Sequence, residues 1–356
     1  MLSALLALST LALAAPVEVA SHPGANIQRP LWSPDGKLLA YEANFHEQQR
    51  IELYAGTAKP QGFQRVKPAS RGLDARAAGF GSSSAADTRV AHELCWAPPS
   101  VSGFAYSAVN SDQDFEVFVA SGTAIAIGPG TDGGPAWSAD GRWLAFTSAR
   151  TGQGDVYLAD LTQLSTPPRR LSSDPTSAEL FLDWSPAAPA LVWVGHSEDA
   201  GDDLWLLSDL QGAAVRLTTS GAATRPSFSP DGRSIAYYSA AHVDGGTRWD
   251  LYIVQAHAGA PPQKLAEGVV PNSAGPVWYP DSSALLTVLD DDAAYDPIAK
   301  VGLQALQPTR LDIGTVGNGD LDLVQGADGK LRVAVVAQGR AQDTERSFKR
   351  LFVAEL

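Results

Sequence analysis

The chain has 356 residues, of which 44% are hydrophobic and 18% charged, and its formal net charge at pH 7 is −13. A hydrophobic fraction this large supports an extensive buried core and argues against a disordered chain. The acidic balance, with no basic cluster, argues against nucleic acid and anionic membrane surfaces as partners. The single cysteine, Cys95, excludes an internal disulfide, and its place beside Trp96 on an expected strand predicts a buried, unreactive thiol.

The first segment, residues 1–14, predicts a signal peptide. It carries no charged residue, is rich in Leu and Ala, and ends in small residues suited to cleavage before Ala15-Pro16. The apolar run is too short to span a bilayer, and no cysteine follows it to carry a lipid anchor. We therefore expect a periplasmic or secreted protein without a membrane span, in which residues 15–356 form a single domain.

A five-residue motif recurs along the rest of the chain and predicts its fold. Clear copies begin at Trp32, Trp137 and Phe228 and read Trp/Phe-Ser-Pro/Ala-Asp-Gly. Weaker copies begin at Trp96, Trp184, Trp278 and Gln325. Consecutive copies are separated by 64, 41, 47, 44, 50 and 47 residues. A period of about 40–50 residues made of short strands is typical of a β-propeller.

Each copy of the motif is followed by the same order of segments, as the first repeat illustrates. An apolar strand ends at Trp32, and Ser-Pro-Asp-Gly then forms a tight turn in which Pro fixes φ and Gly supplies a positive φ. Residues 37–41, 50–55 and 63–66 form three further strands, and the middle one alternates apolar and polar residues. The repeats therefore predict an all-β fold built from four-stranded antiparallel sheets.

The acids and aromatic residues of the motif itself are expected to be structural. A carboxylate at that turn position accepts hydrogen bonds from the backbone amides that follow it, which explains the acid without a ligand. The acids concerned are Asp35, Asp140, Asp231, Asp281 and Asp328. The large aromatic side chains at the start of each motif are expected to pack between neighbouring blades.

The two ends of the chain predict how the ring closes. Residues 350–356 match the third strand of a repeat with no fourth strand after them, whereas residues 17–20 match the absent fourth strand. Pairing these segments would remove the exposed edges of an open stack. Seven motifs with this closure predict seven blades; six blades is the alternative, if the weak last copy is only a cap.

The long first interval contains an insertion. Residues 69–88 include Arg-Gly, Gly-Phe-Gly and Ser-Ser-Ser and have no apolar period. We expect a flexible surface loop between the first two blades, with a loop that grips a partner as the alternative.

The repeat resembles that of a known family. Residues 137–161 and 228–254, including Gly-Asp-Val-Tyr-Leu-Ala-Asp-Leu at 154–161, are similar to the WD-like propeller repeats of TolB. The resemblance covers residues 28–356 and implies a periplasmic binding scaffold, since the TolB propeller docks the peptidoglycan-associated lipoprotein. TolB proteins have six blades and an α/β domain ahead of them, whereas the first motif here begins at Trp32, so a Tol–Pal role does not carry over. Related propellers precede the catalytic domain of prolyl oligopeptidases, but the chain lacks the Gly-x-Ser-x-Gly motif, which argues against a peptidase.

Histidines and acids gather after the expected second strands. His46, His196 and His242 follow these strands in the first, fourth and fifth blades, where the loops open on one face of a propeller. Imidazole and carboxylate together suit a divalent cation, so these three histidines are the candidate metal ligands. The run Asp290-Asp291-Asp292 falls on the same face and completes a candidate partner-binding surface.

The function expected from these features is that of an exported, monomeric binding scaffold without enzymatic activity. Its partner would be a protein or a cell-envelope glycan that contacts the varied loops of one face. No catalytic residue and no cofactor is assigned, apart from the candidate divalent cation. The alternative is a metal-dependent lyase or hydrolase of saccharides, because some seven-bladed TolB-like propellers are metal-dependent lyases of acidic sugars. An acidic face would repel such a sugar unless a bound cation or a buried arginine offset it.

Overall fold

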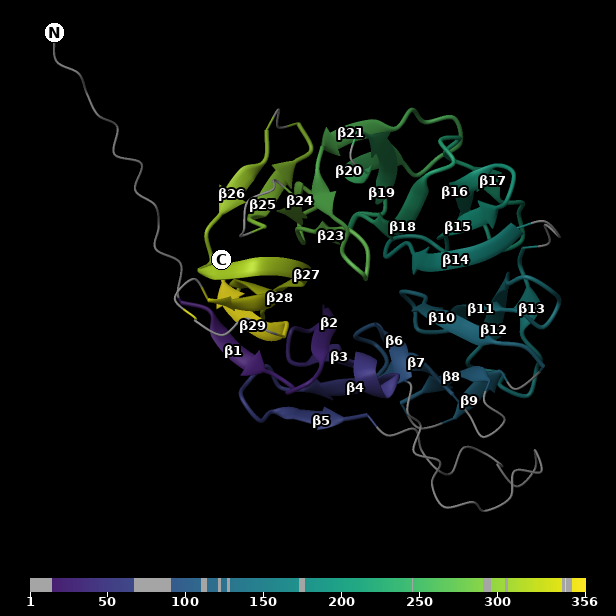
Figure 1. Ribbon diagram of the computed structural model, residues 1–356. Coiled ribbons are helices and arrows are strands. Elements are labelled where there is room, and N and C mark those ends of the chain that lie inside the picture. Colours follow the sequence, from purple (N-terminus) through teal and green to yellow (C-terminus); the bar gives the residue numbers. More distant parts are fainter. Residues whose placement is uncertain are drawn as a thin grey trace, which may run out of the picture.

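Seven antiparallel sheets arranged in a ring make up the protein, as the computed structural model shows (Figure 1). The structure describes residues 15–66, 91–109, 114–120, 123–126, 129–172, 177–244, 246–290, 296–304, 307–340, 343 and 348–356. The prediction of seven blades is confirmed, and the alternative of six is wrong. The expected signal peptide (1–14) and the expected surface loop (69–88) both lie outside the described residues. In the described part of the chain, no helix has the length and apolar character needed to cross a membrane.

The first three blades each contain four strands, and the first strand of each lies innermost (Figure 1). Blade 1 consists of β2 (Asn26–Trp32), β3 (Leu39–Phe45), β4 (Arg50–Gly56) and β5 (Phe63–Arg65), with the short 3₁₀ helix η1 (His46–Gln48) between β3 and β4. Blade 2 consists of β6 (Ala91–Trp96), β7 (Phe104–Val109), β8 (Phe115–Val119) and β9 (Ala124–Ala126). Blade 3 consists of β10 (Asp132–Trp137), β11 (Trp143–Ser148), β12 (Asp155–Asp160) and β13 (Arg169–Arg170).

The next three blades continue in the same way, with one interruption. Blade 4 consists of β14 (Ser177–Trp184), β15 (Leu191–Ser197), β16 (Gly201–Leu207) and β17 (Val215–Arg216). Blade 5 consists of β18 (Ala223–Phe228), β19 (Ser234–Val243), β20 (Gly246–Gln255) and β21 (Gln263–Ala266). Blade 6 consists of β22 (Val269–Val270), β23 (Val277–Trp278), β24 (Ala284–Leu289), β25 (Ile298–Gly302) and β26 (Thr309–Leu311). Its inner strand is split, because β22 and β23 both pair with β24.

Blade 7 closes the ring with strands from both ends of the chain. It consists of β27 (Thr315–Gln325), β28 (Leu331–Arg340), β29 (Arg350–Glu355) and β1 (Val17–Ala20). Val17 pairs with Val353, and Ala20 pairs with Leu351, so the predicted closure is confirmed. An ion pair between Arg350 Nη1 and Glu18 Oε2, 2.8 Å apart, joins the same two strands.

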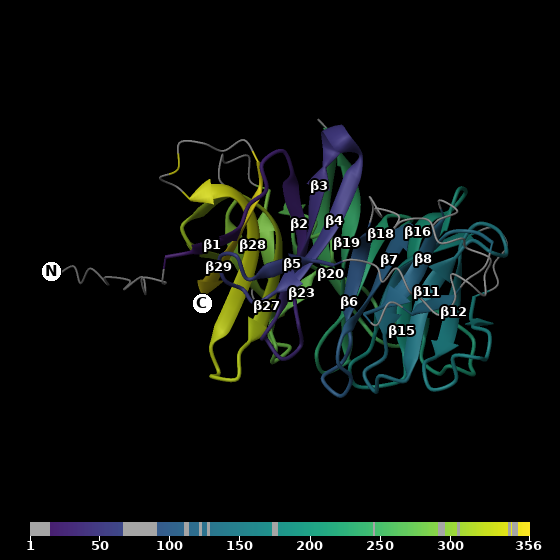
Figure 2. The same cartoon turned by 90° about the horizontal axis from the view of Figure 1, so that it is seen from below.

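The motif turns form one end of the ring, which we call the turn end. The loops between second and third strands, with η1 among them, form the opposite loop end (Figure 2). In the turn of blade 3, Ser138 Oγ donates to Asp140 Oδ1 at 2.6 Å, and the Arg142 backbone N donates to the same oxygen at 3.0 Å. Blades 1 and 5 repeat both bonds. These acids therefore shape turns, as predicted.

The motif aromatics pack between blades, and three of the tryptophans also join neighbouring blades by hydrogen bonds. The Trp184 indole Nε1 of blade 4 donates to the Ala136 carbonyl of blade 3 at 2.8 Å. Trp96 and Trp278 reach back to the preceding blade in the same way. Trp184 also packs in one apolar cluster with Leu158 of blade 3 and Trp193 of blade 4. Burying apolar surface between neighbouring sheets is the main stabilisation of such a ring.

Candidate functional site in the central channel

The inner strands carry a bulge at corresponding places. In blades 1 to 5, the pairing of the inner strand with the second strand shifts register just before the motif aromatic. Blade 7 also shifts register, between Asn318 and Leu321. The residue three positions before each of the first six motif aromatics has a left-handed backbone. These residues are Arg29 (φ 49°), Glu93 (58°), Gly134 (56°), Phe181 (52°), Arg225 (53°) and Gly275 (103°). We call them the channel ring. Bulges re-aim side chains, and residues other than glycine seldom adopt such φ values, so the repetition marks a fixed feature of the scaffold.

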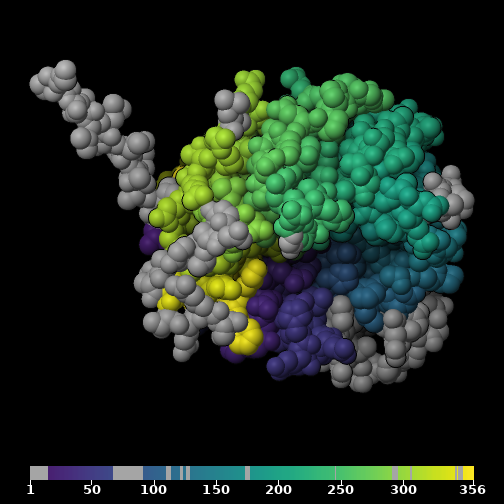
Figure 3. All heavy atoms as spheres, turned by 45° about the horizontal axis from the view of Figure 1, so that its top comes forward, coloured from purple at the N-terminus to yellow at the C-terminus, as the bar shows by residue number. Residues whose placement is uncertain are grey.

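The same backbone thus presents different side chains to the centre of the ring. Two are arginines, one is a glutamate, one is a phenylalanine and two are glycines. A cavity of about 80 Å³ lies among them, lined by five channel-ring residues together with Ser273 and its neighbours. The surface of the molecule is hollowed at this place (Figure 3). Varied side chains on a uniform, rigid backbone are typical of a binding site.

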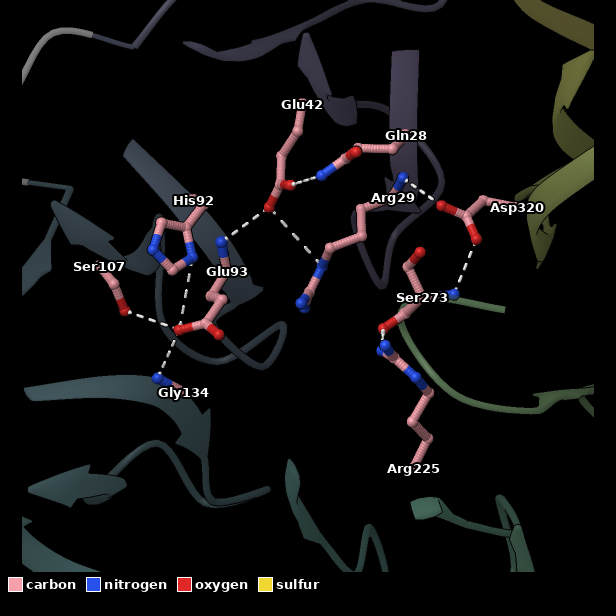
Figure 4. A network of polar contacts seen from close by, with 10 residues as sticks. All are labelled: Gln28, Arg29, Glu42, His92, Glu93, Ser107, Gly134, Arg225, Ser273 and Asp320. Atoms are coloured by element: carbon pink, nitrogen blue, oxygen red, sulfur yellow. Dashed lines mark hydrogen bonds and ion pairs between the residues drawn. The ribbon is translucent and has the colours of Figure 1, made fainter. Parts of the chain in front are cut away.

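Arg29 enters the cavity from blade 1 and is only loosely paired (Figure 4). Its Nε lies 3.7 Å from Glu42 Oε1, and among the described residues no acceptor lies within hydrogen-bond distance of that Nε. Its side chain is 22% exposed and forms part of the cavity lining. The Arg29 backbone N donates to Asp320 Oδ2 at 2.8 Å, which ties blade 1 to blade 7.

Glu42 is the buried acid behind Arg29. Only 3% of it is exposed, and its oxygens accept from Gln28 Nε2 and from the Glu93 backbone N, each at 2.8 Å. The second of these bonds crosses from blade 1 to blade 2. Glu42 therefore has a structural role: it accepts hydrogen bonds from both blades and fixes the wall of the channel behind Arg29.

Glu93 faces the cavity from blade 2 and is also well supplied with donors (Figure 4). Its Oε2 accepts from the Gly134 backbone N at 2.7 Å and from Ser107 Oγ at 3.2 Å, and His92 Nδ1 lies 3.5 Å away. Burial opposes ionisation of this carboxyl, but His92, Arg29 and these hydrogen bonds together lower its pKa. Glu93 is therefore a carboxylate at neutral pH whose charge is already compensated.

Arg225 enters the cavity from blade 5 opposite these groups. Its guanidinium donates to the Ser273 carbonyl and lies 4.7 Å from the centre of the Phe181 ring. Burial lowers the pKa of Arg225, and the positive charge of Arg29 adds to this effect. The two guanidinium groups therefore repel each other across the channel, and an anion placed between them would relieve the repulsion.

The sequence-predicted histidines lie on three different blades. His46 begins η1, His196 lies near the end of β15 and His242 near the end of β19, all at the loop end. His196 Nδ1 lies 2.5 Å from Asp202 Oδ1 at the exposed surface. Across the described residues, no three His, Cys, Asp or Glu side chains come together as a metal site. The metal role of these histidines therefore remains a prediction.

The other predicted residues are placed only in part. Asp290 follows β24, and its backbone N donates to the Gly268 carbonyl at 2.8 Å, whereas Asp291 and Asp292 lie outside the described residues. Burial raises the pKa of Cys95 to about 11. The thiol therefore stays protonated at neutral pH, in agreement with the expected unreactive cysteine.

Sequence reasoning missed the channel ring, although a signal was present. Charged residues occur three positions before the motif aromatic in blades 1, 2 and 5, inside segments otherwise expected to be apolar inner strands. A charged side chain in a buried inner strand is unfavourable unless it is paired or reaches a solvent-accessible space. The bulge provides it by turning the side chain into the channel.

Comparisons with known proteins agree on the fold. No protein-family model matches the chain. An uncharacterized protein of Agrobacterium fabrum is 32% identical over 158 residues, which are 40% of this chain and 52% of that protein. The chain therefore spans about half the length of this curated relative.

Three solved structures show similar rings. An oligogalacturonate lyase in complex with manganese matches with a TM-score of 0.60 and 12% identity, covering 96% of this chain and 95% of that one. The β-propeller domain of the trilobed protease from Pyrococcus furiosus matches at 0.57 and 12%, covering 93% and 95%. A protein assigned as TolB from Agrobacterium tumefaciens matches at 0.50 and 16%, covering 68% and 82%. Identities of this size concern the fold alone. The chain is a TolB-like β-propeller in its fold, with seven blades.

Proposed function

We propose that the chain is an exported binding scaffold whose central channel receives a carboxylate group of a protein or cell-envelope glycan partner. The observation that supports this most is the pair Arg29 and Arg225, which face one cavity. Guanidinium groups bind carboxylates through paired N–H donors. The acids nearby already accept hydrogen bonds from the protein, so the arginines hold the donor capacity that is left.

The size of the channel cavity favours a group that projects from a larger partner. Its volume is about 80 Å³, whereas sites for whole small molecules typically measure about 300–1,000 Å³. A carboxylate-bearing side chain or sugar substituent fits such a space, and the rest of the partner would then rest on the surface around it. This is the behaviour of a docking scaffold.

The loop end supplies the remaining contacts in this proposal. His46 begins η1 at that end, whereas His196 and His242 lie near the ends of β15 and β19 rather than in the loops after them. With the run Asp290-Asp291-Asp292 they form the partner-binding surface that we propose outside the channel. The export of the protein rests on residues 1–14, and the proposed working form is a monomer.

A second candidate is a metal-dependent lyase or hydrolase of acidic saccharides. Two observations favour it: the similarity in fold to an oligogalacturonate lyase in complex with manganese, and the channel arginines, which would offset the repulsion between an acidic protein and an acidic sugar. The donor set of the described residues does not fit a metal. The scaffold is therefore the function that the geometry supports best.

Calorimetric titration with two carboxylate probes, trigalacturonate and an acidic peptide, tests the proposal. We expect Arg29→Gln and Arg225→Gln to weaken binding about tenfold or more, since each removes a charged hydrogen-bond donor. Arg233→Gln is the matched control, because its side chain is 84% exposed at the turn end, and it should leave affinity unchanged. Saturable binding of neither probe, or an equal loss in the control, would contradict the proposal. Cleavage of trigalacturonate that requires added manganese would support the lyase instead.

A further inference from the structure

A larger cavity lies away from the channel, at the seam where the ring closes. Its volume is about 370 Å³, and it is lined by β1 of blade 7, by the segment that leads into β2, and by blade 1. This volume falls in the range of sites that take small molecules. We call it the seam pocket; the side chains that matter here are Glu18, His22, Tyr41, Tyr54, Gln61 and Phe63.

One wall of the seam pocket consists of aromatic rings. The Tyr54 and Tyr41 rings are stacked, with centroids 5.2 Å apart and an interplanar angle of 7°. The His22 ring lies 4.6 Å from Tyr54, and Phe63 meets Tyr41 edge-on at 5.0 Å. The rings therefore form a rigid aromatic wall, and the C–H groups on one face of a ligand would pack against it.

The ionisable groups of the seam pocket leave no unpaired charge. Burial lowers the pKa of His22, although Glu52 pulls in the opposite direction, so the imidazole is neutral at neutral pH. The Glu18 carboxylate is paired with Arg350 at 2.8 Å. A charged ligand would lose its hydration without gaining a counter-charge, so the pocket favours a neutral ligand.

The polar groups of the pocket are suited to hydroxyl groups. Tyr41 Oη and His22 Nε2 are 2.8 Å apart. Burial raises the pKa of Tyr41, so the phenol keeps its proton and donates it to Nε2. The neutral imidazole then carries its own proton on Nδ1, and no acceptor for that N–H is found among the described residues.

Gln61 adds a donor and an acceptor at the rim. Its backbone is left-handed, with φ 63°, and the turn is held by a bond from the Gly62 N to the Lys59 carbonyl at 2.9 Å. A residue other than glycine in this conformation costs free energy, and such strain gathers at ligand sites. The amide of Gln61 and the Nδ1–H of His22 thus provide both kinds of hydrogen-bonding group beside the aromatic wall.

We propose that the seam pocket binds one neutral pyranose ring of a glycan, with a face of the sugar against Tyr54 and Phe63 and its hydroxyls on His22 and Gln61. The combination of aromatic wall, hydrogen-bonding rim and absence of net charge carries this assignment. It goes beyond the carboxylate site of the channel, because the two cavities lie in different parts of the ring and select ligands of different charge.

Saturation-transfer NMR and calorimetry with glucose and N-acetylglucosamine test the proposal. Gln61→Gly removes the amide and relieves the left-handed strain, so we expect the melting temperature to be unchanged or higher while sugar affinity falls about fivefold or more. Gln64→Ala is the matched control, since Gln64 is the exposed neighbour of Phe63 on β5, and it should leave affinity unchanged.

Three results would overturn the seam-pocket proposal. The first is that neither sugar binds saturably at concentrations up to about 50 mM. The second is that Gln61→Gly leaves sugar affinity unaltered. The third is that a purely aromatic probe such as indole displaces no sugar. Arg225→Gln separates this proposal from the channel site, because it should weaken carboxylate binding about tenfold or more while the affinity for neutral sugars stays unchanged.

Discussion

The turn end and the channel ring are both repeated around the propeller, but they repeat in different ways. At the turn end the backbone and the side chains are both the same: a serine Oγ donates to the motif aspartate in blades 1, 3 and 5 at 2.6–2.7 Å. In the channel ring the left-handed backbone is the same, but the side chains range from glycine to arginine. Uniform side chains build the scaffold, and varied side chains on a uniform backbone indicate the site.

Two aromatic residues three positions apart on β14 test this contrast most strongly. Trp184 is 6% exposed and lies between blades, whereas Phe181 of the channel ring is 38% exposed. Trp184→Ala should cost about 3–5 kcal/mol of unfolding free energy, because it empties a large buried site. Phe181→Ala should cost less than about 1 kcal/mol. Urea unfolding of both variants measures the difference, and equal costs would show that the channel ring is part of the structural core.

Half-buried acids at the blade junctions make the scaffold sensitive to pH. Desolvation raises the pKa of Asp183 and of Asp322 to about 7, although each accepts a backbone N–H of the next blade at 2.7 Å. Because the folded pKa lies above the unfolded value of about 3.9, the stability that protonation supplies is complete below about pH 4. It is lost as the pH rises through about 7.

Asp183→Asn should remove part of the dependence of stability on pH, since the Asn amide cannot ionise. We expect the variant to gain about 1–3 kcal/mol relative to the native protein between pH 4 and pH 8. Urea unfolding at pH 4, 6 and 8 gives the comparison, with Asp140→Asn at the exposed turn end as the control. A difference in unfolding free energy between Asp183→Asn and the native protein that stays constant with pH would rule out a neutral Asp183 in the folded state.

The smallest losses of unfolding free energy are expected for substitutions at the turn end. Asp140→Ala removes hydrogen bonds at an exposed turn and should cost about 1 kcal/mol. Asp231→Ala in blade 5 should cost the same within about 0.5 kcal/mol, because its turn makes the same bonds. Thermal and urea unfolding check both values. A large difference between the two would mean that one of these acids does more than shape a turn.

Much of the fold could be predicted from the sequence because the motif reports on its own local structure. The turn needs Pro, Asp and Gly at fixed places, so each copy of the motif indicates one blade. The strand-like segments at residues 17–20 and 350–356 indicate how the ring closes. The channel ring could not be predicted from the same pattern. A bulge changes the backbone without changing the period, and the convergence of Arg29 and Arg225 depends on a ring that brings blades 1 and 5 together.

The seam pocket could not be predicted from the sequence either. It joins Glu18 on the last blade to Tyr54 and Phe63 on the first, and only the closure of the ring places these residues side by side. The predicted loop-end surface was based on the polarity of the loops and their variation from blade to blade. Polar residues are common in all loops, so the pattern named candidates such as His46 and His196 without indicating what brings them together.

The most direct test of the central claim is to observe the arginine side chains themselves during ligand binding. In a ¹H–¹⁵N NMR titration with trigalacturonate, the Nε–H signals of Arg29 and Arg225 should shift with the same saturation curve, while that of Arg233 at the turn end should not move. This result would place the carboxylate in the channel ring. Saturable shifts at Arg233, or at His196 and His242 with none at Arg29 and Arg225, would contradict the account.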